Sequence, residues 1–256
     1  MELTRARDIA TRVEVLPEVG STNAALRALA ADPEAWPHLS VLLTDAQTAG
    51  RGRLDRVWTA PPGASLAISV LLRRLPVDPR ARGWVPLAAG VAMADAVAAQ
   101  LPGSDVVVKW PNDVLVDGRK ICGILAEATG DAVVVGTGVN TAMTTAELPV
   151  PTATSFAVLG AVADVDRLLA DYLLGLDGLV AGLVATGDAV ASGLHATVTA
   201  RCATIGQDVR VSLPGERMLE GRAVRLDEDG RLVVHDDAGE QAVAAGDVVH
   251  VRPALD

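Results

Sequence analysis

The sequence predicts an α+β fold, in which a mixed β-sheet flanked by helices is followed by a small C-terminal β-barrel or sandwich. Two observations favour this class. Before about residue 200, short apolar runs with strand character alternate with longer runs whose apolar residues recur three or four apart, as on one face of a helix. After about residue 200, the chain consists of short runs in which apolar and polar residues alternate, separated by turn residues. We therefore expect a larger domain at residues 1–199 and a β-domain at residues 200–256.

The composition is that of a globular, acidic protein. Hydrophobic residues make up 50% and charged residues 21%, and the net charge of −10 argues against broad binding to nucleic acid or anionic membranes. Cys122 and Cys202 form neither a disulfide framework nor a zinc-binding spacing. The chain begins without the apolar segment of a signal peptide, and the longest apolar stretch, residues 87–101, is too short to span a bilayer. We expect a soluble, cytoplasmic protein.

The N-terminal elements are a strand at residues 12–16, a helix at residues 24–31 and buried strands at residues 40–44 and 65–72. Ser21 or Thr22 is a good N-cap for the helix, and the local interpretation of Ser-Thr-Asn is that cap alone.

Between the two buried strands lies the run Gln-Thr-Ala-Gly-Arg-Gly-Arg-Leu-Asp-Arg-Val-Trp, residues 47–58. Its glycines make a poor strand and a worse helix, so we expect a mobile loop rich in positive charge and free N–H groups. Arginine binds phosphate or carboxylate through a rigid fork of donors, and glycine permits close backbone approach. The segment predicts an anion site; the alternative is a solvated basic surface loop.

A helix is expected at residues 80–101, with Leu87, Val91, Ala94, Ala98 and Leu101 on one face. The segment Val-Val-Val-Lys-Trp-Pro-Asn-Asp, residues 106–113, then indicates a strand that ends in a tight break and gathers polar side chains there. Structurally, the same residues describe a strand terminus with a core tryptophan.

Asp117-Gly118 predicts a hairpin, with Lys120 directly after its turn. The returning strand is apolar on both faces, so Lys120 is either an exposed edge charge or an inward one that needs a negative partner. A strand at residues 132–135 ends in Gly-Thr-Gly-Val-Asn, which is neither a dinucleotide fingerprint nor a P-loop. These glycines indicate close backbone approach at a strand end, with Asn140 presenting its amide.

Residues 141–154 form a loop rich in proline and threonine, and residues 164–193 a helix capped by Asp164. Turns at 206–207, 214–215, 229–230 and 238–239 separate the short C-terminal strands.

The polar side chains at these strand ends comprise several cations and amides, one carboxylate and a tryptophan, which suits a site for two anionic substrates. Their motifs resemble biotin protein ligase, in the family's order and over residues 13–256. The motifs are Ser-Thr-Asn at 21–23, Gln47 with Gly-Arg-Gly-Arg at 50–53, Arg56 and Trp58, Lys-Trp-Pro-Asn-Asp at 109–113, Gly-Arg-Lys-Ile-Cys-Gly-Ile-Leu at 118–125 and Gly-Thr-Gly-Val-Asn at 136–140.

The resemblance implies a catalytic domain of the biotin-lipoate ligase type, similar to class II aminoacyl-tRNA synthetases, followed by an SH3-like domain. It implies that biotin and MgATP form biotinyl-5′-AMP and pyrophosphate. Biotin then passes to a lysine of the biotin carboxyl carrier domain of an acyl-CoA or pyruvate carboxylase. Mg²⁺ is expected on phosphates and waters, with no protein ligand.

The resemblance also implies the site residues. The catalytic group is Lys120, Arg51, Arg53 and Asp113. Biotin is assigned to Ser21, Thr22, Asn23, Gln47, Gly50, Arg51, Gly52, Arg53, Lys120 and Gly123. ATP and the adenylate are assigned to Arg53, Arg56, Trp58, Asn112, Lys120 and Asn140.

Asp55 stands where the family usually has glycine, and its charge is expected to alter loop dynamics or affinity without abolishing activity. Only twenty residues precede Ser21, which predicts a monofunctional ligase without the DNA-binding domain of some family members. The rivals are a lipoate-protein ligase, whose Arg-Arg-x-Ser-Gly-Gly-Gly signature the chain lacks, and a non-catalytic binding or regulatory module.

Overall fold

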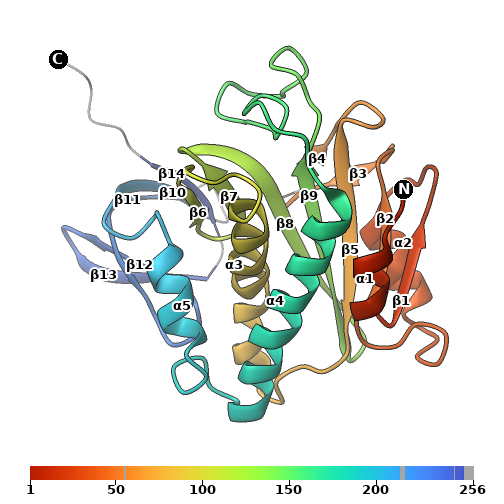
Figure 1. The fold of residues 1–256 in the computed structure, drawn as a ribbon. Coiled ribbons are helices and arrows are strands. Elements are labelled where there is room, and N and C mark those ends of the chain that lie inside the picture. The colour runs from red at the N-terminus through yellow and green to blue at the C-terminus, as the bar shows by residue number, and fades with distance from the viewer. Residues whose placement is uncertain (55, 214–216, 245, 251–256) are drawn as a thin grey trace.

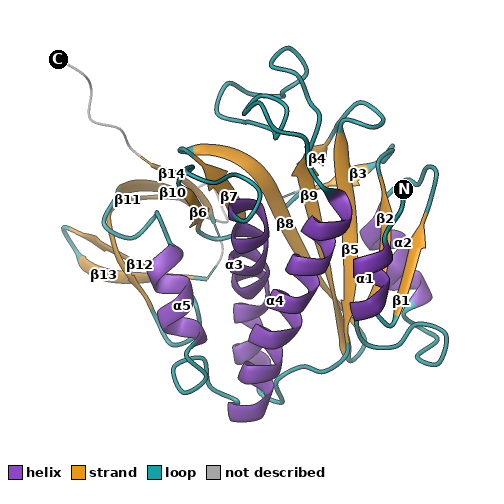
Figure 2. Cartoon of the chain, in the orientation of Figure 1, coloured by secondary structure: helices purple, strands orange, loops and turns teal. Residues whose placement is uncertain are grey.

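The structure is a computed structural model that describes residues 1–54, 56–213, 217–244 and 246–250. Asp55 and the turn expected at 214–215 therefore lie outside the described residues. Two β-sheets organise the chain, with the helices gathered mainly around the larger one (Figures 1 and 2).

The larger sheet has seven strands in the order β1-β2-β5-β9-β8-β7-β6. It is mixed, because β1 pairs parallel with β2 whereas the other neighbours are antiparallel. The strands are β1 (Arg12–Val15), β2 (Ser40–Thr44), β5 (Ser65–Leu72), β6 (Val106–Lys109), β7 (Asp113–Val116), β8 (Arg119–Thr129) and β9 (Ala132–Asn140).

The helices cover both faces of this sheet. In Figure 1, α1 (Thr4–Ile9), α3 (Val85–Ala98) and α4 (Val165–Thr186) lie in front of the sheet, and α2 (Thr22–Leu29) lies behind it. Leu26 of α2 packs with Leu42, Leu71 and Val134 in a small core of its own, separate from the large core on the other face. A 3₁₀ turn, η1 (Pro79–Trp84), leads into α3, and α5 (Leu194–Arg201) leads into the second sheet.

The second sheet is antiparallel, in the order β13-β12-β11-β10-β14, and is the small SH3-like unit expected from the sequence. Its strands are β10 (Asp208–Leu213), β11 (Arg217–Leu226), β12 (Leu232–Asp236), β13 (Gly239–Val243) and β14 (Asp247–His250). Two buried tryptophans join it to the larger domain. Trp84 Nε1 donates to Glu228 O at 2.8 Å, and Trp110 Nε1 donates to Gly230 O at 3.0 Å. The predicted division at residue 199 falls within α5.

Several helix expectations need correction. α1 was not predicted. The helix expected over residues 164–193 ends at Thr186, because Gly187 adopts the left-handed conformation (φ 70°) that closes a helix. α3 is not one-sided, since α4 packs against it opposite the sheet and leaves residues on all sides buried. Asp164 does cap α4, as expected, by accepting from Arg167 N at 3.0 Å.

Helix α4, and not residues 87–101, has the length and apolar character of a membrane-crossing helix. Its apolar side, however, is part of the large core, where residues including Leu169, Tyr172 and Leu176 are fully buried. It packs against both α3 and α1. A helix in these surroundings is a core helix, for which apolar composition is ordinary.

Candidate active site

The predicted site residues surround one cavity of about 310 Å³. It lies on the face of the larger sheet that carries α2. Its lining includes every residue assigned above except Gly50, namely Ser21, Thr22, Asn23, Gln47, Arg51, Gly52, Arg53, Arg56, Trp58, Asn112, Asp113, Lys120, Gly123 and Asn140. Gly50 lies behind the lining residues Gln47 and Trp58, with which any side chain at this position would collide. Residues as far apart as Ser21 and Asn140 therefore share one pocket.

Small residues in neighbouring strands form the floor of the cavity. Gly123 of β8 lies opposite Gly138 of β9, which lies opposite Ala67 of β5. A Cβ atom on Gly138 would come within 2.6 Å of Trp58 Cε2, so this glycine lets the indole ring pack onto the sheet. Close approach at these glycines is thus confirmed. They do not end the strand, however, because β5 and β8 pair with β9 as far as Asn140 and Val139, respectively.

The arginine-rich segment is more ordered than expected. Gly50–Arg51 and Val57–Trp58 form a short antiparallel hairpin, β3–β4, and Gly52 N donates to Arg56 O at 2.7 Å. The register places Gly50 opposite Trp58. Glycine weakens a strand, but here its missing side chain leaves room for the Gln47 amide and the Trp58 carbonyl. Leu54 takes up the left-handed conformation at the hairpin tip (φ 54°).

The N-terminus of α2 forms one wall. Ser21 Oγ accepts from Ala24 N at 3.4 Å, which confirms the predicted cap. Thr22 donates from its backbone N and its Oγ1 to Gln47 Oε1, at 2.9 and 3.1 Å. The Ser-Thr-Asn segment is therefore both a cap and part of the cavity wall.

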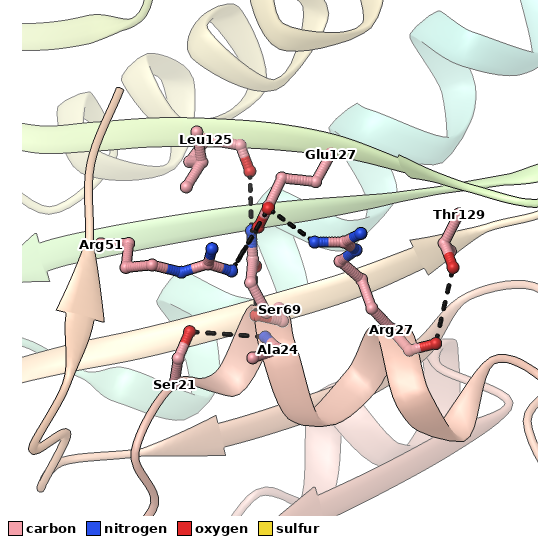
Figure 3. Close-up of polar contacts among 9 residues, drawn as sticks. Ser21, Ala24, Arg27, Arg51, Ser69, Leu125, Glu127 and Thr129 are labelled. Atoms are coloured by element: carbon pink, nitrogen blue, oxygen red, sulfur yellow. Dashed lines mark hydrogen bonds and ion pairs between the residues drawn. The ribbon is translucent and has the colours of Figure 1, made fainter. Parts of the chain in front are cut away.

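Asn23 is buried, and its polar atoms are engaged within the protein. Its Nδ2 donates to Leu125 O at 3.0 Å and to Glu127 Oε2 at 2.8 Å, and its Oδ1 accepts from Ser69 Oγ at 2.6 Å. In Figure 3, Glu127 lies between Arg51 and Arg27. A biotin contact by Asn23 stays a prediction; the observed role is to tie α2 to the sheet.

Lys120 points into the cavity, which resolves the ambiguity of its alternation. Asp117 and Gly118 both have positive φ, as the predicted tight turn requires. Two residues later the register shifts, so that Cys122 pairs with Val114, Lys120 pairs with Leu115 and one residue of β8 is left over. Such a bulge re-aims a side chain. The ammonium group lies 2.6 Å from Asp113 Oδ1, the negative partner that an inward lysine needs.

Arg53 connects three parts of the chain. Its guanidinium donates to Asn112 Oδ1 at 3.3 Å and to Gly246 O at 3.4 Å. Asn112 in turn donates to Ile124 O at 2.8 Å. Gly246 belongs to the C-terminal domain and lines the cavity, although no site residue was expected in that domain. No motif marks Gly246, so only the packing of the two domains could reveal it.

Asn140 is buried, and its Nδ2 donates to Thr154 O at 2.9 Å. The amide thus holds the proline- and threonine-rich loop against β9. That loop supplies Met143, Pro149, Val150 and Ala153 to the cavity lining. These apolar contributors were missed, because a loop carries no periodic pattern that assigns a face.

Two ionisable side chains, Cys122 and Tyr172, lie behind the floor of the cavity and are uncharged. Burial raises the pKa of the Cys122 thiol and of the Tyr172 hydroxyl well above their ordinary values, so both are neutral near pH 7. Tyr172 Oη lies 3.0 Å from Thr137 Oγ1. Among the residues that the structure describes, no group of three or more His, Cys, Asp or Glu side chains could hold a metal ion.

This fold and cavity define an acyl-adenylating ligase of the biotin and lipoate type. Residues 19–140 match the biotin/lipoate A/B protein ligase family, and residues 204–251 match the biotin protein ligase C-terminal domain. The chain is 41% identical over 243 residues to the biotin–[acetyl-CoA-carboxylase] ligase of Mycobacterium tuberculosis, covering 94% of this chain and 90% of the relative. It is 31% identical to the enzyme of that name from Paracoccus denitrificans, covering 91% and 98%.

The fold is also that of a solved structure. The Aquifex aeolicus biotin protein ligase in complex with biotin and ATP aligns with a TM-score of 0.76 at 24% identity, covering 95% of this chain and all of that one. The chain belongs to the biotin protein ligase family.

Proposed function

We propose that this protein joins biotin to ATP and then transfers the biotinyl group to a lysine of a biotin carboxyl carrier domain. The observation that carries the proposal is the convergence of fixed cations, one carboxylate and a glycine floor on a single cavity in a member of the biotin protein ligase family. The relatives named above act on acetyl-CoA carboxylase, which makes the carrier domain of an acyl-CoA carboxylase the first acceptor to test; pyruvate carboxylase is the second.

In the first step, a carboxylate oxygen of biotin attacks the α-phosphorus of ATP. A C–O–P bond forms, the bond to the β-phosphate breaks, and pyrophosphate leaves. Both reactants are anions, so the approach needs fixed positive charge. Lys120 and Arg53 meet this need, and donors already in place lower the cost of the charge that develops in the transition state. Mg²⁺ bound together with ATP would supply further charge neutralisation, and we assign no protein ligand to it.

In the second step, the ε-amine of the acceptor lysine attacks the acyl carbon, an amide bond forms and AMP leaves. The amine must lose its proton before attack. Asp113 suits this role because it lies beside Lys120 in the cavity and has a partly exposed carboxylate. When anionic substrate draws Lys120 away, Asp113 is released to accept the proton.

We assign the remaining residues of the cavity to the binding of biotin or of the adenylate. Biotin's ureido ring and bicycle belong to the wall made by Ser21, Thr22, Gln47 and the backbone of Arg51. The adenylate belongs to Trp58, Asn112 and Asn140, with Trp58 stacking on adenine; Arg56 faces the phosphate. The side-chain amide donors of Asn112 and Asn140 are used within the protein, so we assign these two residues to shaping the adenylate site. The β3–β4 hairpin covers the mixed anhydride, which water would otherwise hydrolyse.

Pyrophosphate exchange into ATP tests the proposal. Exchange should depend on biotin, and transfer should yield a biotinylated carrier domain detectable by mass. Exchange with lipoate in place of biotin would favour a lipoate-protein ligase. Salt-sensitive binding to duplex DNA without exchange would favour a regulatory module. Neither alternative is favoured by the acidic net charge or by the relatives. A cytoplasmic location stays a prediction.

A further inference from the structure

Glu127 contacts several elements of the fold, although no sequence motif marks it. It lies on β8 opposite Val134, four residues beyond Gly123 and on the same face of the sheet, yet it is not part of the cavity lining. Its side chain is 17% exposed. A carboxylate this deeply placed needs partners, because an unpaired buried charge is costly.

Three donors from two different elements meet this carboxylate (Figure 3). From α2, Asn23 Nδ2 lies 2.8 Å from Oε2 and Arg27 Nη1 lies 2.9 Å from Oε1. From the hairpin, Arg51 Nη2 lies 3.3 Å from Oε1 and 3.4 Å from Oε2. Asn23 and Arg27 are four residues apart, on one face of α2. The side chain of Glu127, on the larger sheet, therefore contacts both α2 and the β3–β4 hairpin, the two elements that line the biotin side of the cavity.

This arrangement changes what Arg51 contributes. From the sequence, Arg51 is expected in the catalytic group and in the biotin site, within a loop predicted to bind anions. In the structure the charge of Arg51 faces Glu127, so it is offset before any substrate arrives. The anchored residue pairs with Val57 in the hairpin, and the hairpin carries Arg53 and Trp58 into the cavity. The side chain of Arg51 is thus placed to tether the hairpin as well as to line the cavity. Lys120 and Arg53 also line the cavity, where they contact Asp113 and Asn112.

We propose that Glu127 is a positioning residue that tethers the β3–β4 hairpin to the sheet through Arg51 and sets the α2 wall through Asn23. It touches neither substrate nor reacting atoms. Its effect on catalysis, which rests on the proposed function, is to hold the biotin side of the cavity closed. Loss of the tether should weaken biotin binding more than it slows the chemical step.

The first test is hydrogen–deuterium exchange of the full-length protein, followed over peptides that cover residues 50–58. Glu127→Gln keeps the size of the side chain but removes its charge, and Arg51→Met removes the donor from the other side. Both variants should exchange these amides about two- to fivefold faster, the range expected for one partly exposed ion pair. Arg51→Lys should restore most of the protection. Unchanged exchange in folded Arg51→Met overturns the tether.

Two controls separate the tether from general loosening. Arg27→Met removes a Glu127 partner that lies on α2, and exchange over residues 50–58 should stay at the wild-type rate. Glu220→Gln breaks an ion pair with Arg210 in the C-terminal sheet and should also leave the hairpin unchanged. An equal rise in either control contradicts a specific role for the Glu127–Arg51 contact.

The second test is kinetic. In pyrophosphate exchange, Glu127→Gln should raise KM for biotin about two- to fivefold and change kcat less than twofold. A loss of kcat alone overturns the positioning role. If the wild-type protein catalyses no biotin-dependent exchange, the proposed function fails, whereas the hydrogen-exchange experiment still decides whether the tether exists.

Discussion

The ammonium group of Lys120 and Oδ1 of Asp113 lie 2.6 Å apart, joined across the β7–β8 hairpin that the bulge in β8 distorts. The two side chains are 34% and 20% exposed, so the pair is partly solvated. Pairs of this kind contribute roughly 0–1 kcal/mol to stability. The pair therefore does little to hold the fold together, and variants of either residue report on chemistry.

Replacing Lys120 with alanine should remove nearly all adenylate formation while leaving the protein folded. The ammonium is the cation that Asp113 holds in the cavity, and removal of one such preorganised charge costs about a hundred- to a thousandfold in rate. Biotin-dependent pyrophosphate exchange measures the loss, and the melting temperature monitors the fold. Lys120→Arg should retain more activity than Lys120→Ala, because it keeps the charge. Exchange at the wild-type rate in Lys120→Ala would remove the residue from the site.

Replacing Asp113 with asparagine should damage transfer more than adenylation. The amide keeps the shape of the side chain but cannot accept the proton of the acceptor ammonium, and such general-base contributions amount to about a hundred- to ten-thousandfold. Single-turnover transfer from preformed adenylate to the carrier domain isolates this step. ATP binding should stay within about twofold of wild type. Equal losses in adenylation and transfer would contradict a proton-accepting role.

Much of the fold was predictable because its signals are local. The Asp117-Gly118 turn, the caps at Ser21 and Asp164 and the buried strand at residues 40–44 each follow from a few neighbouring residues. The residues expected in the site line one cavity, apart from Gly50 behind it. Their roles rest on the family resemblance and stay predictions.

The rest depended on pairing between distant segments. No local signal shows that β9 continues through Gly136 and Gly138, because the strands on either side supply its hydrogen bonds. The β3–β4 hairpin was missed for the same reason. Glu127 stands in an ordinary strand, and its importance comes from Arg51, 76 residues away. Such contacts arise only when the sheet is assembled.

Replacing Gly138 with alanine should displace Trp58. The added Cβ would lie 2.6 Å from the indole ring, so the ring or the strand must shift, and overpacking of this kind costs about 1–3 kcal/mol. The free energy of unfolding from urea titration and KM for ATP should both change. Gly178→Ala is the matched control, since that glycine lies in α4 with open space around it, and alanine favours a helix. A stable Gly138→Ala protein with unchanged kinetics would show that Trp58 does not need this floor.

Replacing Trp110 with phenylalanine should loosen the C-terminal domain. The change keeps an aromatic ring in the core but removes the N–H that donates to Gly230 O at 3.0 Å, which leaves a buried carbonyl unpaired. Such a loss costs about 1–3 kcal/mol. Urea unfolding measures it, and hydrogen exchange over residues 227–231 should rise at the same time. An unfolding free energy within about 0.5 kcal/mol of wild type would mean that water or another donor satisfies the carbonyl.

Stability should fall as the solution becomes alkaline. Burial raises the pKa of the Cys122 and Cys202 thiols above their ordinary value of 9.0, so the folded protein keeps two protons that the unfolded chain releases above that pH. The stabilisation that these two protonated thiols contribute is fully present below about pH 9. Above that pH, the free energy of unfolding declines by up to about 1.4 kcal/mol per pH unit for each thiol. Urea unfolding at several pH values from about 8 to 11 measures the slope. Cys122→Ala should make the slope shallower whatever it does to stability at neutral pH. Parallel curves for the variant and the wild type would show that the Cys122 thiol ionises as readily in the folded protein as in the unfolded chain.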